Sequence, residues 1–168
     1  MRISRVWYRV GQFARTLWAP LLPVDVAYAA QHLSPSLLDL FRRMSPAEQQ
    51  HGIALCKQLA SQGYQDSDLL VAALLHDVGK LTAAPWLWER VVVVLVEHAL
   101  PERAAAWGEG APTGWRRAFV IRSRHPEWGA SLAEKAGASP RTVALIRSHH
   151  SDPGEDRLLA ALQAVDDA

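Results

Sequence analysis

The residues with the clearest chemical potential are histidines and aspartates that recur on the apolar faces of predicted helices. His51 lies four residues before Leu55, and Asp166 follows Leu159 by seven. Positions with these spacings share one helix face, so the polar side chains point inward. A buried carboxylate such as that of Asp77 is costly unless it is paired or binds a cation. The candidate set comprises His51, His76, Asp77, His125 and Asp166, together with His149 or His150.

This set predicts a metal centre. One inward histidine is an ordinary hydrogen-bonded core residue, but several histidines and two aspartates on separate helices call for a common explanation. Imidazole and carboxylate ligands without thiolates suit zinc, iron, manganese or nickel, and Cys56 is the only cysteine. The adjacent His76 and Asp77 can serve one metal, and the carboxylate can also reach a second metal about 3.5–4 Å away.

Helical spacing separates some neighbouring candidates and leaves others open. Asp166 continues the apolar face of its helix, whereas Asp167 faces outward. His149 and His150 each share a face with different apolar residues, so spacing alone does not choose between them. His125 is expected at a loop-to-helix junction, where the start of a helix holds its side chain steady.

The order His51, His76-Asp77, Asp166 in a helical chain resembles the HD-domain superfamily of metal-dependent phosphohydrolases. The run Leu-Leu-His-Asp-Val-Gly-Lys at 74–80 carries the most specific likeness, and the resemblance covers residues 45–168. In that superfamily the first histidine, the His-Asp pair and the final aspartate bind metal. The resemblance implies these roles for His51, His76, Asp77 and Asp166.

Two further histidines resemble the two-metal branch of the superfamily, which includes diadenosine tetraphosphate hydrolases and the HD-GYP phosphodiesterases of cyclic di-GMP. The extra histidines of that branch bind the second metal, which implies this role for His125 and His149. Lys80 matches the lysine of the HD-x-G-K pattern, which contacts phosphate or orients the site in relatives. After His150 the chain has Ser-Asp-Pro-Gly-Glu-Asp in place of Gly-Tyr-Pro, which argues against cyclic di-GMP as the substrate.

The resemblance implies hydrolysis of a phosphoester or phosphoanhydride in a nucleotide or another small phosphorylated molecule by metal-activated water. Asp77 and Lys80 are the expected catalytic residues: the first bridges the metals and orients the nucleophile, and the second holds phosphate charge. Arg122 and Arg124 are either further phosphate contacts or surface charges. The expected cofactor is two divalent transition-metal ions, iron or manganese first, with nickel and zinc as alternatives.

Two other functions remain open at this point. The chain could be a metal-binding regulatory or signalling domain without turnover, or a di-iron oxygenase of the HD type. A regulatory domain would keep the metal ligands without hydrolysing a substrate, whereas the turnover of an oxygenase would depend on oxygen.

Helix-start and helix-stop signals place these residues on a series of helices. The signals are a serine or aspartate before the first turn, a proline at the first helical position and a glycine after the last. The block 85–107 is ambiguous, because its four consecutive valines favour a strand while its length favours a buried helix. No alternating strand pattern occurs, so we expect an all-α, single-domain helical bundle of the HD-domain type. The predicted helices cover 2–18, 34–43, 45–61, 69–78, 126–136, 140–150 and 155–168.

Residues 1–44 precede the motifs and are expected to form an N-terminal helical extension packed on the core of the domain 45–168. Within it, residues 2–18 have apolar side chains at helical spacing, with arginines elsewhere around the helix. This pattern fits a helix that covers the core, and it also fits a membrane-surface helix or one that forms a homodimer.

Composition excludes several classes of protein. A chain of 168 residues can bury one core without disulfides, and a net charge of +1 argues against a nucleic-acid binder. The longest apolar runs fall short of the about 20 residues of a membrane-spanning helix. Pro20 and Pro23 interrupt the apolar run of a would-be signal peptide. We therefore expect a cytoplasmic protein whose partner is a small phosphorylated substrate.

Overall fold

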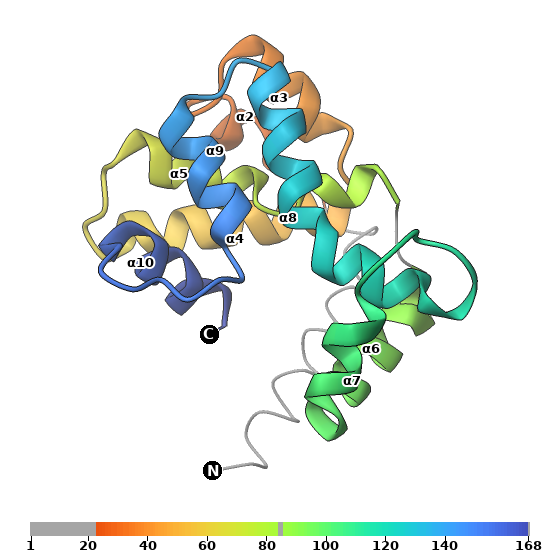
Figure 1. Ribbon diagram of the computed structural model, residues 1–168. Coiled ribbons are helices and arrows are strands. Elements are labelled where there is room, and N and C mark those ends of the chain that lie inside the picture. The colour runs from red at the N-terminus through yellow and green to blue at the C-terminus, as the bar shows by residue number, and fades with distance from the viewer. Residues whose placement is uncertain (1–22, 84–85, 168) are drawn as a thin grey trace.

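The computed structural model describes residues 23–83 and 86–167, and every regular element in these ranges is helical. This confirms the predicted all-α, single-domain bundle (Figure 1). The helix predicted over 2–18 lies outside the described residues. In chain order the elements are α2 (Val26–Ala29), α3 (Pro35–Arg42), α4 (Pro46–Ser61), α5 (Ser67–Leu75), the 3₁₀ helix η2 (Val78–Leu81), α6 (Leu87–Ala99), α7 (Pro101–Trp107), the 3₁₀ helix η3 (Gly114–Arg116), α8 (Arg117–Lys135), α9 (Pro140–Ser148) and α10 (Arg157–Asp166).

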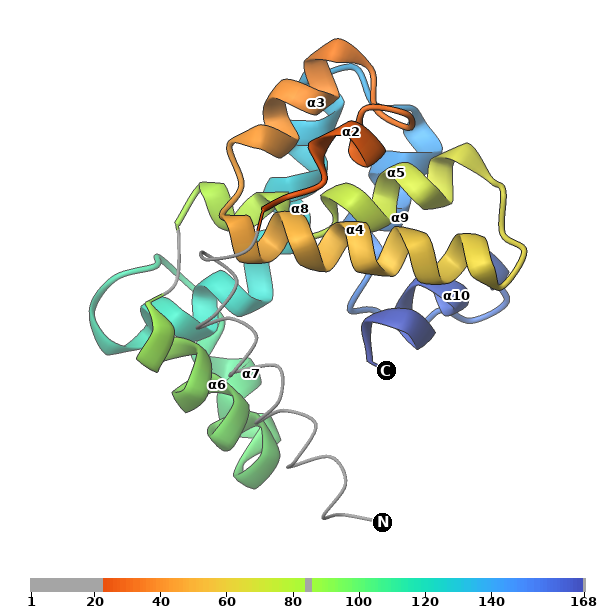
Figure 2. The same ribbon diagram turned by 180° about the vertical axis from the view of Figure 1, so that it is seen from behind.

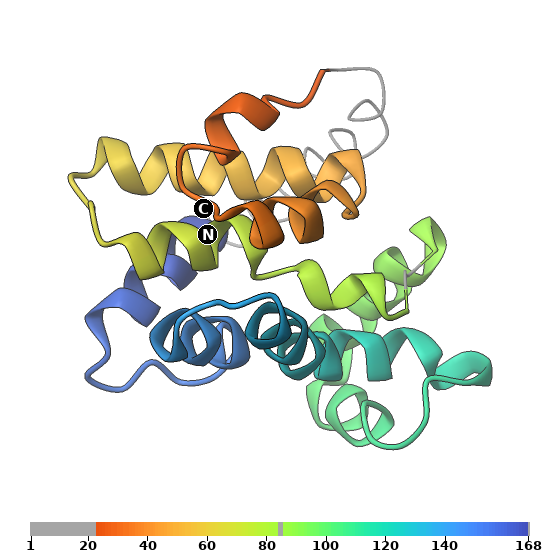
Figure 3. The same cartoon turned by 90° about the horizontal axis from the view of Figure 1, so that it is seen from above.

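Helix α5 is the centre of the main hydrophobic core. Every residue from Leu69 to Leu75 is buried, as expected for a helix that is apolar all round. It lies between α4 and α9 (Figure 3) and also contacts α10. Since α4, α5, α9 and α10 all carry predicted ligands, packing around α5 is what brings those ligands together.

Predicted helix starts agree well with the structure where a side chain caps the first turn. The Ser45 hydroxyl accepts from the backbone N–H of Glu48, and the Glu48 carboxylate accepts from the backbone N–H of Ser45. This capping box fixes the start of α4. Ser34 and Asp66 cap α3 and α5 in the same way. Helix α2 was not predicted, because its four residues are too few to show a helical period.

The described part of residues 1–44 shares the main core. Ala29 of α2 and Leu37, Leu40 and Phe41 of α3 are buried in the same cluster as α5. Figure 2 shows α2 and α3 together on the face of the bundle that is seen from behind.

A smaller hydrophobic cluster holds the α6–α7 hairpin to the first half of α8. Val93 of α6, Ala104 of α7 and Phe119 of α8 are its buried members, and Trp107 packs against them. Buried Glu89 accepts from the Trp86 backbone N–H at 2.6 Å and from a guanidinium N–H of α8 at 2.5 Å. The hairpin extends away from the main core and is joined to it through α8 (Figures 1 and 2).

The block 85–107, left open between a strand and a buried helix, is helical in its described part but is not a single buried helix. The chain forms two helices there, because Pro101 opens α7 directly after Leu100. Among the described residues, the hairpin packs on α8 through Val93, Ala104 and Trp107, while Trp88 and Leu95 are 62% and 63% exposed. Local hydrophobicity does not reveal how many neighbours a helix has. Among the described helices, none is both long and apolar enough to cross a membrane.

The helix predicted to begin at Pro126 is also wrong. Helix α8 runs without interruption from Arg117 to Lys135, with Pro126 inside it. A proline lacks the N–H that would bond the carbonyl four residues earlier, here that of Arg122. The Nδ1–H of His125 donates to this carbonyl at 2.9 Å. The histidine side chain therefore supplies the hydrogen bond that the proline cannot make.

Helix α5 ends earlier than the predicted boundary at Val78. Its last residue is Leu75, His76 is the C-cap, and Asp77 immediately precedes η2. The chain turns here because η2 packs backbone to backbone on α8. A Cβ atom on Gly79 would lie 1.9 Å from the His125 carbonyl oxygen and 2.6 Å from the Gly129 nitrogen. Only glycine permits this approach, which puts Asp77 beside His125.

We expect Gly79→Ala to destabilise the fold by about 3 kcal/mol, because the new methyl group would force two backbones apart. Gly129→Ala is the graded comparison, since its Cβ would meet the Gly79 nitrogen at 3.1 Å and should cost about 1 kcal/mol. Urea unfolding followed by circular dichroism measures both. Equal stability of Gly79→Ala and the parent would contradict this account of the η2–α8 contact.

Candidate metal centre

The predicted site residues come together from five different helical regions. His51 lies in the first half of α4, His76 and Asp77 lie between α5 and η2, and Asp166 is the last residue of α10. His125 lies within α8, and His149 is the C-cap of α9. His125 is thus inside a helix, and the expected loop-to-helix junction is wrong.

The first group of side chains that could hold a metal ion comprises His51, His76 and Asp77, whose ligand atoms all lie within 4.8 Å of one another. Asp166 joins this group. Its Oδ1 is 2.9 Å from His51 Nε2 and 3.8 Å from His76 Nε2. Asp167 is exposed, so the choice of Asp166 over Asp167 by helical spacing agrees with the structure.

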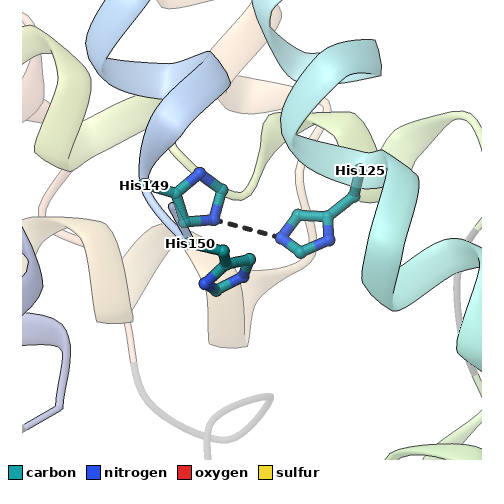
Figure 4. A group of neighbouring side chains, drawn as sticks. All are labelled: His125, His149 and His150. Atoms are coloured by element: carbon teal, nitrogen blue, oxygen red, sulfur yellow. Dashed lines mark hydrogen bonds between the residues drawn. The ribbon is translucent and has the colours of Figure 1, made fainter. Parts of the chain in front are cut away.

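The second group comprises His125, His149 and His150, whose ligand atoms also lie within 4.8 Å of one another. Figure 4 shows the three rings facing one another, two from the end of α9 and one from α8. His125 Nε2 and His149 Nε2 are 3.2 Å apart. Spacing left His149 and His150 as alternatives, and the structure brings both to the same group.

The carboxylate of Asp77 lies between the two groups. Its Oδ2 is 3.6 Å from His76 Nε2 in the first group, and its Oδ1 is 3.4 Å from His125 Nε2 in the second. Lys80 Nζ donates to Oδ2 at 2.5 Å. One carboxylate thus presents a different oxygen to each group, which is the arrangement of a ligand shared by two ions.

Backbone carbonyls orient three of the imidazoles. Nδ1 of His76 lies 3.0 Å from the Ala73 carbonyl oxygen, and Nδ1 of His149 lies 2.7 Å from that of Ile146. His125 contacts the Ile121 carbonyl oxygen in the same way at 3.1 Å. A carbonyl only accepts, so each Nδ1 carries the hydrogen. In the neutral ring the Nε2 lone pair then faces the centre, as metal-binding histidines require.

Electrostatics of the second group favour a cation. Burial lowers the pKa of His149 to about 3, with His76 and His125 adding to the effect. Burial also lowers the pKa of His125. Both rings are therefore neutral near pH 7 and turn Nε2 lone pairs toward each other. Two facing lone pairs repel unless a cation lies between them, so the donor set fits a metal ion.

Both aspartates remain ionised. Burial alone would raise the pKa of Asp77, but Lys80 and the His76 and His125 imidazoles hold it well below its ordinary range. Burial would likewise raise the pKa of Asp166, which the His51 hydrogen bond and the nearby His76 ring instead lower. Two carboxylates, fixed and charged, complete the ligand set.

The centre opens to solvent through a pocket of about 420 Å³. Gln163 lines it and donates to the carbonyls of His149 and Ser151 at 3.2 and 2.6 Å, which fixes the segment after α9 against α10. The sequence carries no signal for this contact, because Gln163 and its two carbonyl partners meet only through the turn between α9 and α10. The pocket is lined by Arg122, His149, His150, Ser151, Asp152, Gln163, Asp166 and Asp167.

We expect the metal-free protein to lose stability as the pH falls from about 7 to about 5. Folded His125 and His149 stay neutral because their pKa is lowered, whereas the unfolded chain takes up protons near pH 6.5. The unfolded state binds more protons, so His149 should remove about 2 kcal/mol of the free energy of unfolding over this range, and His125 acts in the same direction. Urea titrations with a chelator present measure the slope.

His149→Gln should reduce this pH dependence by about 2 kcal/mol between the two pH values, while the matched change His98→Gln, at an exposed position of α6, should leave it unchanged. If the free energy of unfolding does not change between pH 7 and pH 5, the buried rings of His125 and His149 do not remain neutral in the folded protein.

In comparisons with protein-family models, curated proteins and solved structures, no match to this chain was found.

Proposed function

We propose that the protein is a metal-dependent phosphohydrolase that cleaves a phosphoester or phosphoanhydride of a small phosphorylated molecule with water. The observation that carries the proposal is the Asp77 carboxylate, which turns one oxygen to each of two groups of histidines. Two-metal hydrolases share a carboxylate in this manner. The resemblance of residues 45–168 to the HD-domain superfamily supports the same reaction.

The charge of the centre supports an anionic substrate. Two divalent ions would bring four positive charges, of which the Asp77 and Asp166 carboxylates would cancel two, and the neutral His125 and His149 rings would add none. Lys80 adds a further positive charge at 2.5 Å from Asp77. A partly buried centre with such an excess attracts phosphate oxygens far more strongly than neutral groups.

Each of the two ions would have its own ligands. His51, His76, Asp77 and Asp166 would hold one, and Asp77, His125 and His149 the other, with His150 beside it. Bound divalent metals lower the pKa of water towards neutrality and neutralise phosphate charge. Iron or manganese suits these nitrogen and oxygen ligands, and nickel and zinc are alternatives.

The chain's own residues then bind and orient the reactants. The Asp77 carboxylate, fixed by Lys80 and His125, orients the attacking water beside the phosphorus atom. Lys80 Nζ also offers hydrogens to a phosphate oxygen at the edge of the buried centre. The attacking oxygen forms the new P–O bond, the bond to the leaving group breaks, and the leaving oxygen takes up a proton.

Metal content is the decisive measurement. We expect elemental analysis to find about two transition-metal ions per chain in protein purified without chelators. Asp166→Asn should reduce this to about one ion and lower hydrolysis of nitrophenyl phosphate esters and nucleotides by at least about 100-fold. Asp39→Asn is the control, because this aspartate is exposed on α3 and does not line the pocket of the centre, and it should keep the parent's metal content and rate.

Circular dichroism checks that each variant keeps its helicity. The proposal fails if the parent binds no metal after reconstitution, or if Asp166→Asn hydrolyses at the parent's rate. Bound metal without turnover of any phosphoester would instead support a regulatory metal-binding domain.

A second variant separates metal binding from phosphate binding. Lys80→Gln removes a positive charge next to Asp77, so metal affinity should be unchanged or higher. Hydrolysis should fall by about 10²-fold, since a preorganised charge at the phosphate is lost. Elemental analysis with steady-state kinetics measures both. Loss of metal in Lys80→Gln would show that the lysine acts only by orienting Asp77.

A further inference from the structure

A second open groove adjoins the metal centre on the side of the α6–α7 hairpin. Its volume is about 680 Å³, within the range of about 300–1,000 Å³ that is usual for small-molecule sites. It shares Arg122, His150 and Ser151 with the pocket beside Asp166. We name it the α7–α8 groove, and its main walls are Pro101, Ala104 and Ala105 of α7 and Phe119, Arg122 and Pro126 of α8.

The helical period of α8 joins this groove to the metal centre. Phe119, Arg122 and Pro126 follow one another at spacings of three and four and therefore share one face. His125 lies on the adjacent, buried face of the same helix. A ligand that occupied the groove would therefore lie along α8 between the α6–α7 hairpin and His150 of the second histidine group.

The walls of the groove suit an uncharged organic group. Pro101 and Ala105 supply exposed apolar surface above the buried Ala104, Phe119 and Pro126, and the charged side chains at its edges are paired. Arg147 Nε is 2.9 Å from a Glu127 carboxylate oxygen, and Arg122 Nε is 3.2 Å from Glu97 Oε1. The two arginines and the two carboxylates beside the groove neutralise one another, so the groove offers no net positive charge to a second phosphate.

Arg122 marks the boundary between the groove and the centre. Its Nε–H donates to Glu97 of α6, and its Nη1 contacts His150 Nε2. The hairpin thus holds the guanidinium beside the second group of histidines. A planar guanidinium can bind two phosphate oxygens at once, which makes Arg122 a phosphate-binding residue at the point where the groove begins.

We propose that the α7–α8 groove binds the uncharged, largely apolar organic group of a phosphoester whose phosphate lies at the metal centre, with Arg122 holding the phosphate between them. This inference rests on the proposed function and specifies its substrate class.

Binding of two phosphonates to the metal-loaded protein tests the groove directly. Phenylphosphonate and methylphosphonate share a head group and resist hydrolysis, so they differ only in the apolar ring. We expect calorimetry to show the phenyl compound binding at least about tenfold more tightly. Ala105→Trp, which fills the groove, should abolish this preference and leave methylphosphonate within about twofold.

Ala106→Trp is the matched control. Ala106 is the next residue of α7 and equally exposed, but it does not line the groove, so its variant should keep the preference. Ala105→Glu is a second test at the same position, and its charge should weaken phenylphosphonate binding as the tryptophan does. Thermal unfolding confirms that each variant is folded.

The outcomes separate the groove from the reaction. Equal affinities for the two phosphonates, or equal effects of the two tryptophan substitutions, would overturn the groove proposal alone. Failure of the metal-loaded parent to bind either phosphonate would overturn the proposed function as well. Arg122→Gln should weaken both phosphonates about tenfold, whereas Arg124→Gln, which lines neither pocket, should weaken neither.

Discussion

The buried carboxylate of Asp77 is the group on which the rest of the centre depends. A fully buried negative charge is tolerated only when opposite charges and hydrogen-bond donors surround it. Asp77 obtains its opposite charge from Lys80 at 2.5 Å, and the Nε2 atoms of His76 and His125 lie 3.6 and 3.4 Å from its two oxygens. His76 and Lys80 are close to Asp77 in the sequence, whereas His125 is on α8, so the carboxylate meets His125 only when η2 has packed on α8.

That packing depends on backbone geometry as much as on side chains. Gly79 lets η2 touch α8, and without this contact Asp77 Oδ1 would not reach His125. Pro126 leaves the Arg122 carbonyl without its helical donor, and His125 Nδ1 bonds to it. The bond holds the ring with Nε2 toward His149. A residue that interrupts helical hydrogen bonding thus orients a candidate metal ligand.

The sequence predicted the helical class and the starts of α3, α4 and α5, because capping side chains act within a few residues of their own position. Helical spacing also placed Asp166 inward and Asp167 outward. Prediction from helical spacing failed at α8. The spacing of inward-facing residues continues across Pro126, from Ile121 to Gly129, but the proline was interpreted as the start of a helix. Helical spacing could not reveal that α6 is half exposed or that Arg122 meets Glu97, because such contacts depend on how distant segments pack.

The two hydrophobic clusters have separate consequences for the candidate site. The main core contains α4, α5, α9 and α10 and thus positions every candidate ligand except His125. The smaller cluster positions α7 and Arg122 through the first half of α8. Helix α8 belongs to both clusters. Because it is one continuous helix, the face that lines the groove and the face that carries His125 keep a fixed orientation relative to each other. Substitutions on the hairpin can therefore alter the shape of the α7–α8 groove without moving Asp77, which is held by residues of the main core and by His125. In this architecture, substrate preference can change while the ligand geometry stays the same.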